Sequence, residues 1–208
     1  MSYICLKKKN KAYQIFVDDE YIGFIYSSDF PGIGLNARDF DDDFDIYELE
    51  TEEDIVSKFK NIITDRTFEK AVALATTSEC CREDIFFKLK RKDYPEYAIE
   101  AAIDMMYEYN YLNDKRYAEC YIRSYMKTKS KKAIEKELEM KKLYIPALGE
   151  FIDRVYEDEG MSEEKTIEKL LQSKYRGQDM SDPKVKKRAM GLLIRHGFSF
   201  DQINNYLT

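Results

Sequence analysis

One spacing of apolar residues occurs three times in the chain from about residue 66 onward. After a first apolar residue, others follow at +4, +9, +14 and +18, and the three copies are offset by 49 and 55 residues. A step of four residues is one helical turn, whereas each step of five crosses a short turn between two helices. The spacing therefore predicts the second and third helices of a three-helix unit. The three copies are Ile85, Leu89, Tyr94, Ile99 and Ile103; Ile134, Leu138, Leu143, Leu148 and Ile152; and Ala189, Leu193, Phe198, Ile203 and Leu207.

The helix that opens each unit repeats as well. Leu112-Asn113 and Met161-Ser162 lie 49 residues apart, as do Tyr121-Ile122 and Leu170-Leu171, while the first unit fits more loosely. One such unit buries little apolar surface, but stacked units build a continuous core. The sequence therefore predicts a mainly α fold of three tandem three-helix repeats, at 66–112, 113–160 and 161–208, that form an elongated curved domain. The helix N-caps expected within it are Ser78, Asn113 or Asp114, Ser130, Ser162, and Asp182 before Pro183.

Residues 1–65 predict a small β-containing extension. β-Branched and aromatic residues fill three runs, at 3–6, 13–17 and 21–26, and the last two runs are separated by a short acidic turn. This pattern favours a hairpin or a three-stranded meander. Asp39 to Asp45 is expected to be an acidic loop, and a short helix is expected to begin near Thr51.

Composition argues against several classes of protein. The net charge is −6, with −7 on residues 1–68 and +3 on residues 161–208, so only local basic strips suit phosphate binding. No apolar run reaches the length of about 18 residues that a membrane helix needs, and the start lacks a signal segment. The cysteines lack the spacing of metal ligands, which favours reduced thiols and a cytoplasmic location.

No catalytic or cofactor site is recognisable in the sequence. Gly32 and Gly34 are followed by acidic residues, which would repel a phosphate group. The single histidine, His196, precedes Gly197, and this pair is typical of a helix end: the glycine as the C′ residue and the histidine near the negative end of the helix dipole. We therefore expect a protein that is not an enzyme and that needs no cofactor or metal.

Two segments, from Tyr111 to Glu119 and from Arg195 to Ile203, resemble motifs of the RecX family. The segment from Tyr111 to Glu119 is similar to the family's run of an aromatic, Leu, Asp or Asn, Asp, any residue, Arg, an aromatic and Ala, and the segment from Arg195 to Ile203 is similar to its terminal Arg-x-Gly-Phe-Ser-aromatic-Asp-x-Ile. Asn110 and Ser130 stand where the family often has glycine, and Asn tolerates the left-handed backbone that such a turn needs. The resemblance covers about residues 68–208 and implies the family's helical repeats.

The resemblance also implies a function. RecX proteins bind the RecA recombinase, lodge in the groove of its filament on DNA, and limit its growth and activities without catalysing a reaction. A member would act in homologous recombination, DNA repair and the SOS response, with RecA and the RecA–DNA filament as partners. We expect a monomer. The alternative is a nucleic-acid-binding helical repeat module that grips single- or double-stranded DNA directly, with an affinity that falls steeply with salt.

Candidate contact residues are the basic strips near the second helix of each unit. They could face RecA or DNA, or they could only solvate helices and balance nearby glutamates. The motif residues are expected to be mostly structural, and they are Leu112, Asp114, Arg116, Tyr117, Ala118, Gly197, Phe198 and Ser199. The strip residues are Lys88, Lys90, Arg91 and Lys92; Arg123, Lys127, Lys129, Lys131 and Lys132; and Lys184, Lys186, Lys187, Arg188 and Arg195.

Overall fold

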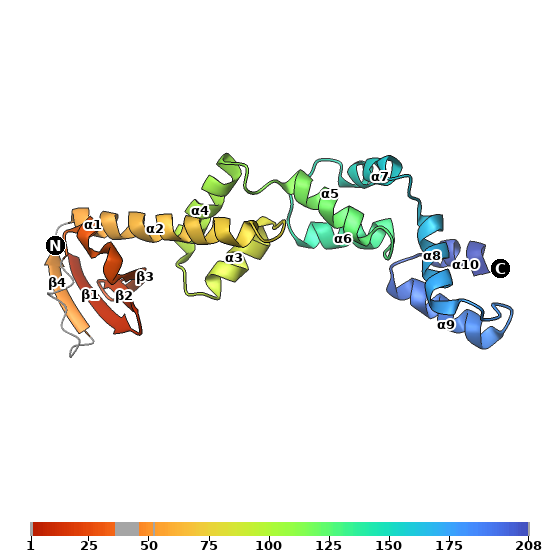
Figure 1. Ribbon diagram of the computed structural model, residues 1–208, viewed down its shortest axis with the longest axis horizontal. Helices are drawn as coiled ribbons and strands as arrows, with labels where there is room; N and C mark the ends of the chain where they lie inside the picture. Colours follow the sequence, from red (N-terminus) through yellow and green to blue (C-terminus); the bar gives the residue numbers. More distant parts are fainter. Residues whose placement is uncertain (1, 36–45, 52, 208) are drawn as a thin grey trace. The chain divides into compact units, whose positions relative to one another are not determined.

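The computed structural model describes residues 2–35, 46–51 and 53–207 (Figure 1). The chain divides into two units, Met1–Leu112 and Asn113–Thr208, which are described in turn. The predicted mainly α class is confirmed, with three-helix repeats that follow an N-terminal sheet. The expected acidic loop at 39–45 lies outside the described residues.

The N-terminal sheet has four antiparallel strands in the order β3-β2-β1-β4. The predicted meander is confirmed as β1 (Ser2–Lys9), β2 (Ala12–Val17) and β3 (Glu20–Tyr26). The strand β4 (Ile46–Thr51) was not predicted, and it pairs with β1 from Ser2↔Thr51 to Lys7↔Ile46. Its partner lies far away in the sequence, so no hairpin turn marks it. A helix begins near Thr51 as expected, since α2 starts at Glu53, but Thr51 itself is the last residue of β4.

The inner face of the sheet packs against helices. Alternate residues of β1 to β3, such as Ile4, Ile15 and Ile25, are fully buried. A 3-10 turn (Ser27–Asp29) leads into α1 (Phe30–Ile33), and α2 (Glu53–Ala75) follows β4. Phe30 from α1 and Phe59 from α2 complete this core.

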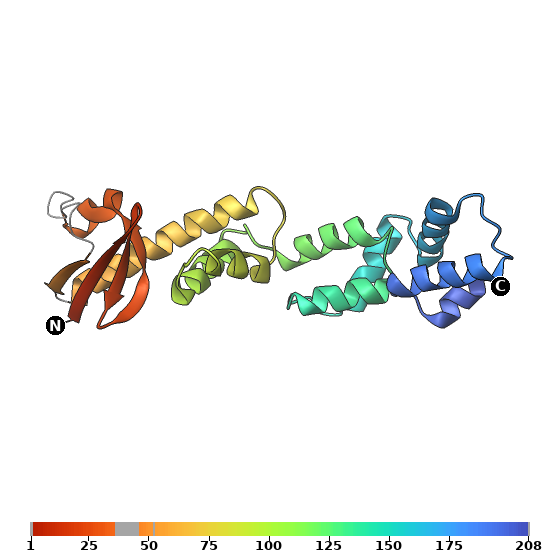
Figure 2. The same cartoon turned by 90° about the horizontal axis from the view of Figure 1, so that it is seen from below.

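The helix α2 joins the sheet to the first repeat (Figure 2). A short helix is predicted here, but α2 has 23 residues and contains no glycine or proline that would end it. Ile63 packs into the core of the sheet, whereas Ala71 packs with α3 (Arg82–Lys90) and α4 (Glu96–Glu108). The boundary proposed between residues 65 and 66 thus falls inside one helix, and the division of this unit stays a proposal.

The first repeat shows one wrong cap. Ser78 is predicted to begin α3, but the N-cap is Cys81, in an extended conformation with φ −98° and ψ 170°. Cys80 and Cys81 are both buried, so the chain packs inward through them and the helix begins only at Arg82. The Oγ atom of Ser78 instead lies 3.8 Å from the Sγ atom of Cys80.

The second unit contains the other two repeats. They are α5 (Asp114–Tyr125), α6 (Lys131–Met140) and α7 (Leu148–Asp158), and then α8 (Glu163–Tyr175), α9 (Pro183–Arg195) and α10 (Phe200–Leu207). The caps predicted at Asn113, Ser130, Ser162 and Asp182 are confirmed, since each side chain accepts a backbone N–H of the first turn. Twelve of the fifteen residues of the apolar spacing are buried, and the other three, Tyr94, Leu143 and Leu148, are half-buried near turns.

A buried hydroxyl joins these two repeats. Thr166 of α8 is fully buried, and its Oγ1 atom donates a hydrogen bond of 2.6 Å to the carbonyl of Met126, the C-cap of α5. The carbonyl at a helix end has no partner within its own helix, so this bond satisfies a buried acceptor.

We predict that Thr166→Val lowers the free energy of unfolding by about 1 to 3 kcal/mol, because the shape is kept while a buried acceptor loses its partner. Thr166→Ser keeps the hydroxyl and serves as the control. Urea unfolding followed by circular dichroism measures both variants. Equal stability of Thr166→Val and the wild type would show that the bond contributes nothing.

Candidate functional site

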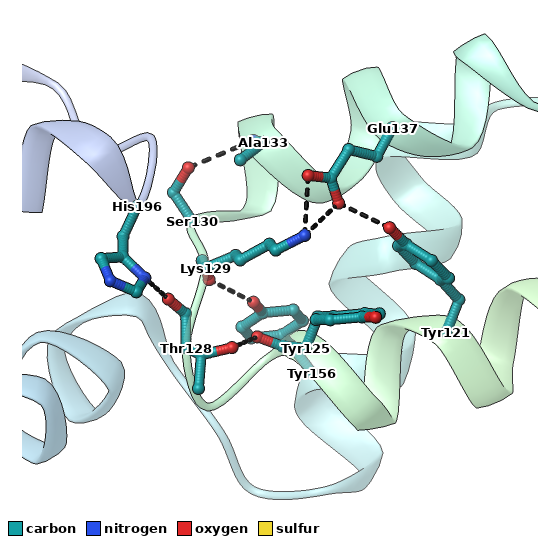
Figure 3. A network of polar contacts seen from close by, with 9 residues as sticks. All are labelled: Tyr121, Tyr125, Thr128, Lys129, Ser130, Ala133, Glu137, Tyr156 and His196. Carbon is teal, nitrogen blue, oxygen red and sulfur yellow. Dashed lines mark hydrogen bonds and ion pairs between the residues drawn. The ribbon is translucent and has the colours of Figure 1, made fainter.

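The loop between α5 and α6 is attached to the turn between α9 and α10 (Figure 3). The backbone N–H of Ser130 donates to the carbonyl of His196 over 2.9 Å, and the Ser130 Oγ atom donates to the carbonyl of Gly197 over 2.7 Å. The Nδ1 atom of His196 also contacts the carbonyl oxygen of Thr128. We call this set of contacts the repeat junction; it ties the second repeat to the third.

Gly197 is required at the repeat junction for two reasons. It follows α9 with φ +87°, a left-handed conformation that favours glycine. A Cβ atom added there would also lie 2.6 Å from the Cβ atom of Ala133 and 2.7 Å from the Oγ atom of Ser130. The predicted helix end at His196 and Gly197 is confirmed, because His196 is the C-cap of α9.

The first motif spans the end of the first repeat and the start of α5, and several of its side chains are buried. Leu112 is buried in the core of the first repeat, and Tyr117 and Ala118 are buried residues of α5. Asn113 caps α5 by accepting the backbone N–H of Arg116 over 3.0 Å. Asp114 accepts the backbone N–H of Tyr144, at 2.9 Å, and so attaches the α6–α7 turn to α5. The expectation that Asn110 keeps a left-handed turn is confirmed by its φ of 57°.

The second motif forms the start of α10. Phe198 is buried in the core of the third repeat. The backbone N–H of Ser199 donates to the Oε1 atom of Gln202 over 2.9 Å, and the backbone N–H of Gln202 donates to the Oγ atom of Ser199 over 3.3 Å. These reciprocal bonds are a capping box. The aromatic residue that follows, Phe200, is the first residue of α10 and is 62% exposed.

Much of the second basic strip is paired within the protein. Lys129 donates to both carboxyl oxygens of Glu137, at 2.7 and 2.6 Å, and its ammonium lies 4.1 Å from the centre of the Tyr125 ring. Lys131 pairs with Asp153 at 2.6 Å, and Arg123 pairs with Glu159 at 2.8 Å. These cations hold α5, α6 and α7 together, which reduces the charge they could offer to a partner.

Glu137 is the acceptor at the centre of this cluster. Burial by itself would raise the pKa of its carboxyl, but hydrogen bonds from Lys129 and Tyr121 outweigh burial and hold that pKa below its ordinary value of 4.5. The Tyr121 hydroxyl donates to Glu137 over 2.6 Å. Burial, and then this hydrogen bond, raise the pKa of Tyr121, so its hydroxyl stays protonated as a donor.

The other strip residues differ in their surroundings. Lys127, Lys132, Lys187 and Arg195 are exposed and form no ion pair with the residues that the structure describes. Arg188 donates to Gln178 over 3.3 Å. The first strip lies in the first unit, where Lys90 pairs with Glu96 at 3.1 Å, Lys88 lies 3.5 Å from the Sγ atom of Cys80, and Arg91 is exposed.

Exposed apolar side chains beside the repeat junction were not predicted. Ile194 is 42% exposed and lines a pocket of about 760 Å³ together with Lys131, Lys132 and Ser199. Phe200 follows Ser199 directly. We call Lys127, Lys132, Ile194 and Phe200 the junction surface. The sequence hints at this surface in one way: Ile194 and Phe200 are apolar but fall outside the spacing of the core residues.

The described residues contain neither a metal site nor a membrane helix. Among the residues that the structure describes, no cluster of His, Cys, Asp and Glu could hold a metal ion. The same residues include no helix long and apolar enough to cross a membrane.

The fold and the repeat junction define a protein of tandem three-helix repeats. Residues 162–207 match the family model described as RecX, third three-helix domain. The chain is 28% identical over 201 residues to Regulatory protein RecX of Bacillus velezensis, covering 95% of this chain and 72% of that one. It is 29% identical over 141 residues to Regulatory protein RecX of Vibrio campbellii, covering 67% of this chain and 88% of that one. The chain is thus similar to proteins of the RecX family, over its third repeat in the family model and over most of its length in these relatives.

Solved structures show the same fold. One is a crystal structure of regulatory protein RecX, with a TM-score of 0.54 at 20% identity over 99% of this chain and 100% of that one. RecX from Lactobacillus salivarius has a TM-score of 0.51 at 22% identity over 70% of this chain and 94% of that one.

We predict that Gly197→Ala lowers the free energy of unfolding of the second unit by about 2 to 4 kcal/mol, because left-handed strain adds to overpacking against Ala133. Gly177→Ala is the matched control: Gly177 has φ +77° but no atom lies within 4 Å of an added Cβ. It should cost about 1 kcal/mol. Chemical unfolding compares the two, and equal costs would mean that the close approach is unimportant.

Acid pH should weaken the cluster around Glu137. The pKa of the Glu137 carboxyl is lower in the folded protein than its ordinary value of 4.5. The ionised carboxyl therefore stabilises the folded state fully above pH 4.5, and this stabilisation is lost as the pH falls through the lowered pKa. Glu137→Gln should therefore be less stable than the wild type at neutral pH and lose less stability below pH 4.5. Glu139→Gln, at an exposed site on the same helix, is the control. Identical pH profiles for the wild type and Glu137→Gln would contradict this account.

Proposed function

We propose that the chain is a non-catalytic regulator of homologous recombination and DNA repair that binds RecA and its nucleoprotein filament, mainly to inhibit RecA. The proposal is supported by the match of residues 162–207 to the RecX family model and by similar proteins that are named regulatory protein RecX. RecA as the partner, its inhibition, and action as a monomer in the cytoplasm are part of the proposal.

The observation that carries the proposal is that, around the repeat junction, the motif residues make contacts within the protein while their neighbours are exposed. Gly197, Phe198 and Ser199 of the second motif are used internally, as a helix end, a core residue and a helix cap. The neighbouring Ile194 and Phe200 are exposed instead. Exposed apolar side chains beside unpaired lysines suit a protein partner, because the centres of interfaces are apolar or aromatic and their rims are polar.

Direct DNA binding by the helical strips is the second candidate, and the ion pairs count against it. Lys90, Arg123, Lys129 and Lys131 are each paired with a carboxylate. A phosphate would have to displace that carboxylate, which reduces the gain from binding. Strong DNA binding that declines steeply with salt, without RecA inhibition, would favour this alternative.

The ion pairs also change the choice of variants. Charge reversal at Lys129 would place a second carboxylate beside Glu137, and reversal at Lys131 would do the same beside Asp153. Either change would disturb the fold as well as the surface. Lys127 and Lys132 are the better positions, because both are exposed and unpaired among the described residues.

We predict that Lys127→Glu/Lys132→Glu inhibits the DNA-dependent ATPase activity of RecA about tenfold more weakly than the wild type, the loss expected for about 1.4 kcal/mol of interface contact. Lys169→Glu/Lys174→Glu makes the same charge change at exposed positions of α8 and should inhibit normally. No inhibition by the wild-type chain at micromolar concentration would refute the proposed function. Normal inhibition by the first variant would refute the role of these two lysines.

A further inference from the structure

The outer face of the N-terminal sheet combines aromatic and basic side chains. Strand pairing aligns them in rows across the sheet: Lys7 lies opposite Gln14, which lies opposite Phe24. In the neighbouring row Phe16 lies between Cys5 and Tyr21. These side chains alternate with the buried ones of the inner core, so they point away from that core.

The turn between α3 and α4 lies beside this face. The Tyr21 hydroxyl donates to the carbonyl of Asp93 over 2.8 Å, and the rings of Phe24 and Tyr94 have their centres 5.0 Å apart. The turn thereby brings Lys90 and Lys92 of the first basic strip to the sheet. We call this combined surface the sheet–turn face; its residues are Lys7, Lys9, Phe16, Phe24, Lys90 and Lys92.

Three adjoining hollows follow the sheet–turn face. One, of about 500 Å³, is lined by Lys9, Phe16 and Lys90 among others. A smaller one, of about 160 Å³, is lined by Lys9, Phe24 and Lys92. The third, of about 460 Å³, is lined by Phe24, Lys70 and Lys92. Since neighbouring hollows share lining residues, they offer a continuous path on which the rings of Phe16 and Phe24 can be reached.

The rings are held in place before any ligand arrives. Phe24 is flanked by Tyr94 and by Tyr26, with ring centres 5.0 and 5.9 Å away, and Tyr21 lies 5.6 Å from Phe16. The Lys7 ammonium lies 4.7 Å from the centre of the Phe16 ring. A ring that is already ordered loses little conformational entropy when a ligand stacks on it.

The local charge is favourable to an anion, although the whole extension is acidic. Lys9, Lys70 and Lys92 form no ion pair with the described residues, whereas Lys90 pairs with Glu96. The carboxylates that line the hollows are Asp93, Glu96 and Glu69. The acidic turn between β2 and β3 lies at the opposite end of these strands from Lys9.

We propose that the sheet–turn face binds single-stranded nucleic acid, with bases stacked on Phe16 and Phe24 and phosphates near Lys9 and Lys92. Aromatic side chains on an exposed sheet, interleaved with lysines, are the combination that recognises unstacked bases and their backbone. Because the bases of a duplex stay stacked on each other, a duplex can contact only the lysines of this face. The site lies in the first unit and needs no RecA, so it goes beyond the proposed function and can fail independently of it.

The chain contains no tryptophan, so a single one can report on stacking. In the full chain, Phe24→Trp keeps an aromatic ring at the proposed site, and Phe200→Trp places the same probe in the second unit. We expect a 20-nucleotide oligothymidine to quench the fluorescence of Phe24→Trp and leave that of Phe200→Trp unchanged. An unchanged signal from Phe24→Trp, in a variant with the circular dichroism spectrum of the wild type, would overturn the proposal.

Binding measured by fluorescence anisotropy of the labelled oligothymidine gives a second, independent readout. Phe24→Ala should bind about tenfold more weakly, within the range of stacking energies for one base. Lys9→Glu/Lys92→Glu should bind at least about tenfold more weakly and with a shallower dependence on salt. Lys136→Glu/Lys174→Glu is the matched charge control and should bind like the wild type. The proposal would be overturned if Phe24→Ala and Lys9→Glu/Lys92→Glu both bound with the affinity of the wild type, or if a duplex of equal length bound more tightly than the single strand.

Discussion

The close contact between Ser130 and Gly197 is the constraint on which the second unit depends. It joins a loop of the second repeat to a turn of the third, 67 positions away in the sequence. Only glycine fits, because a side chain at position 197 would meet Ala133 and Ser130. Ser130 has two roles there, since its hydroxyl caps α6 and also bonds to the third repeat. The buried bond from Thr166 to Met126 supports the same pair of repeats from α8. Most residues of the two motifs shared with RecX proteins therefore build the repeats or join one repeat to the next.

This arrangement separates the residues that build the protein from those free to bind. Lys129 is the clearest example: it lies in the middle of the second basic strip, yet its ammonium is paired with Glu137 and lies over the ring of Tyr125. The exposed positions are Lys127 and Lys132, on either side of Lys129 in the sequence, and Ile194 and Phe200, on either side of Gly197. The first unit carries a different combination, aromatic rings and lysines on a sheet. We infer that the two units have different ligands, a protein for the second and a single strand for the first.

Periodicity predicted the repeats because a core position is set by local spacing, and Ile134, Leu138 and Leu193 are fully buried as expected. Short-range chemistry likewise predicted most of the caps and the left-handed Asn110. Features that depend on distant partners were missed. The strand β4 is defined by its pairing with β1, and α2 runs past the expected boundary because its two ends pack into different cores. Which lysines are paired depends on how α5, α6 and α7 pack, and no spacing in the sequence reports that.

The central claim is that the surface around the repeat junction contacts RecA. Amide hydrogen exchange of the full chain, measured alone and with RecA filaments assembled on DNA, tests it most directly. The account predicts added protection at residues 126–132 and 194–200, with little change in α7, which contributes no residue to the junction surface. Protection confined to other segments, with 126–132 and 194–200 exchanging as in the free chain, would contradict it.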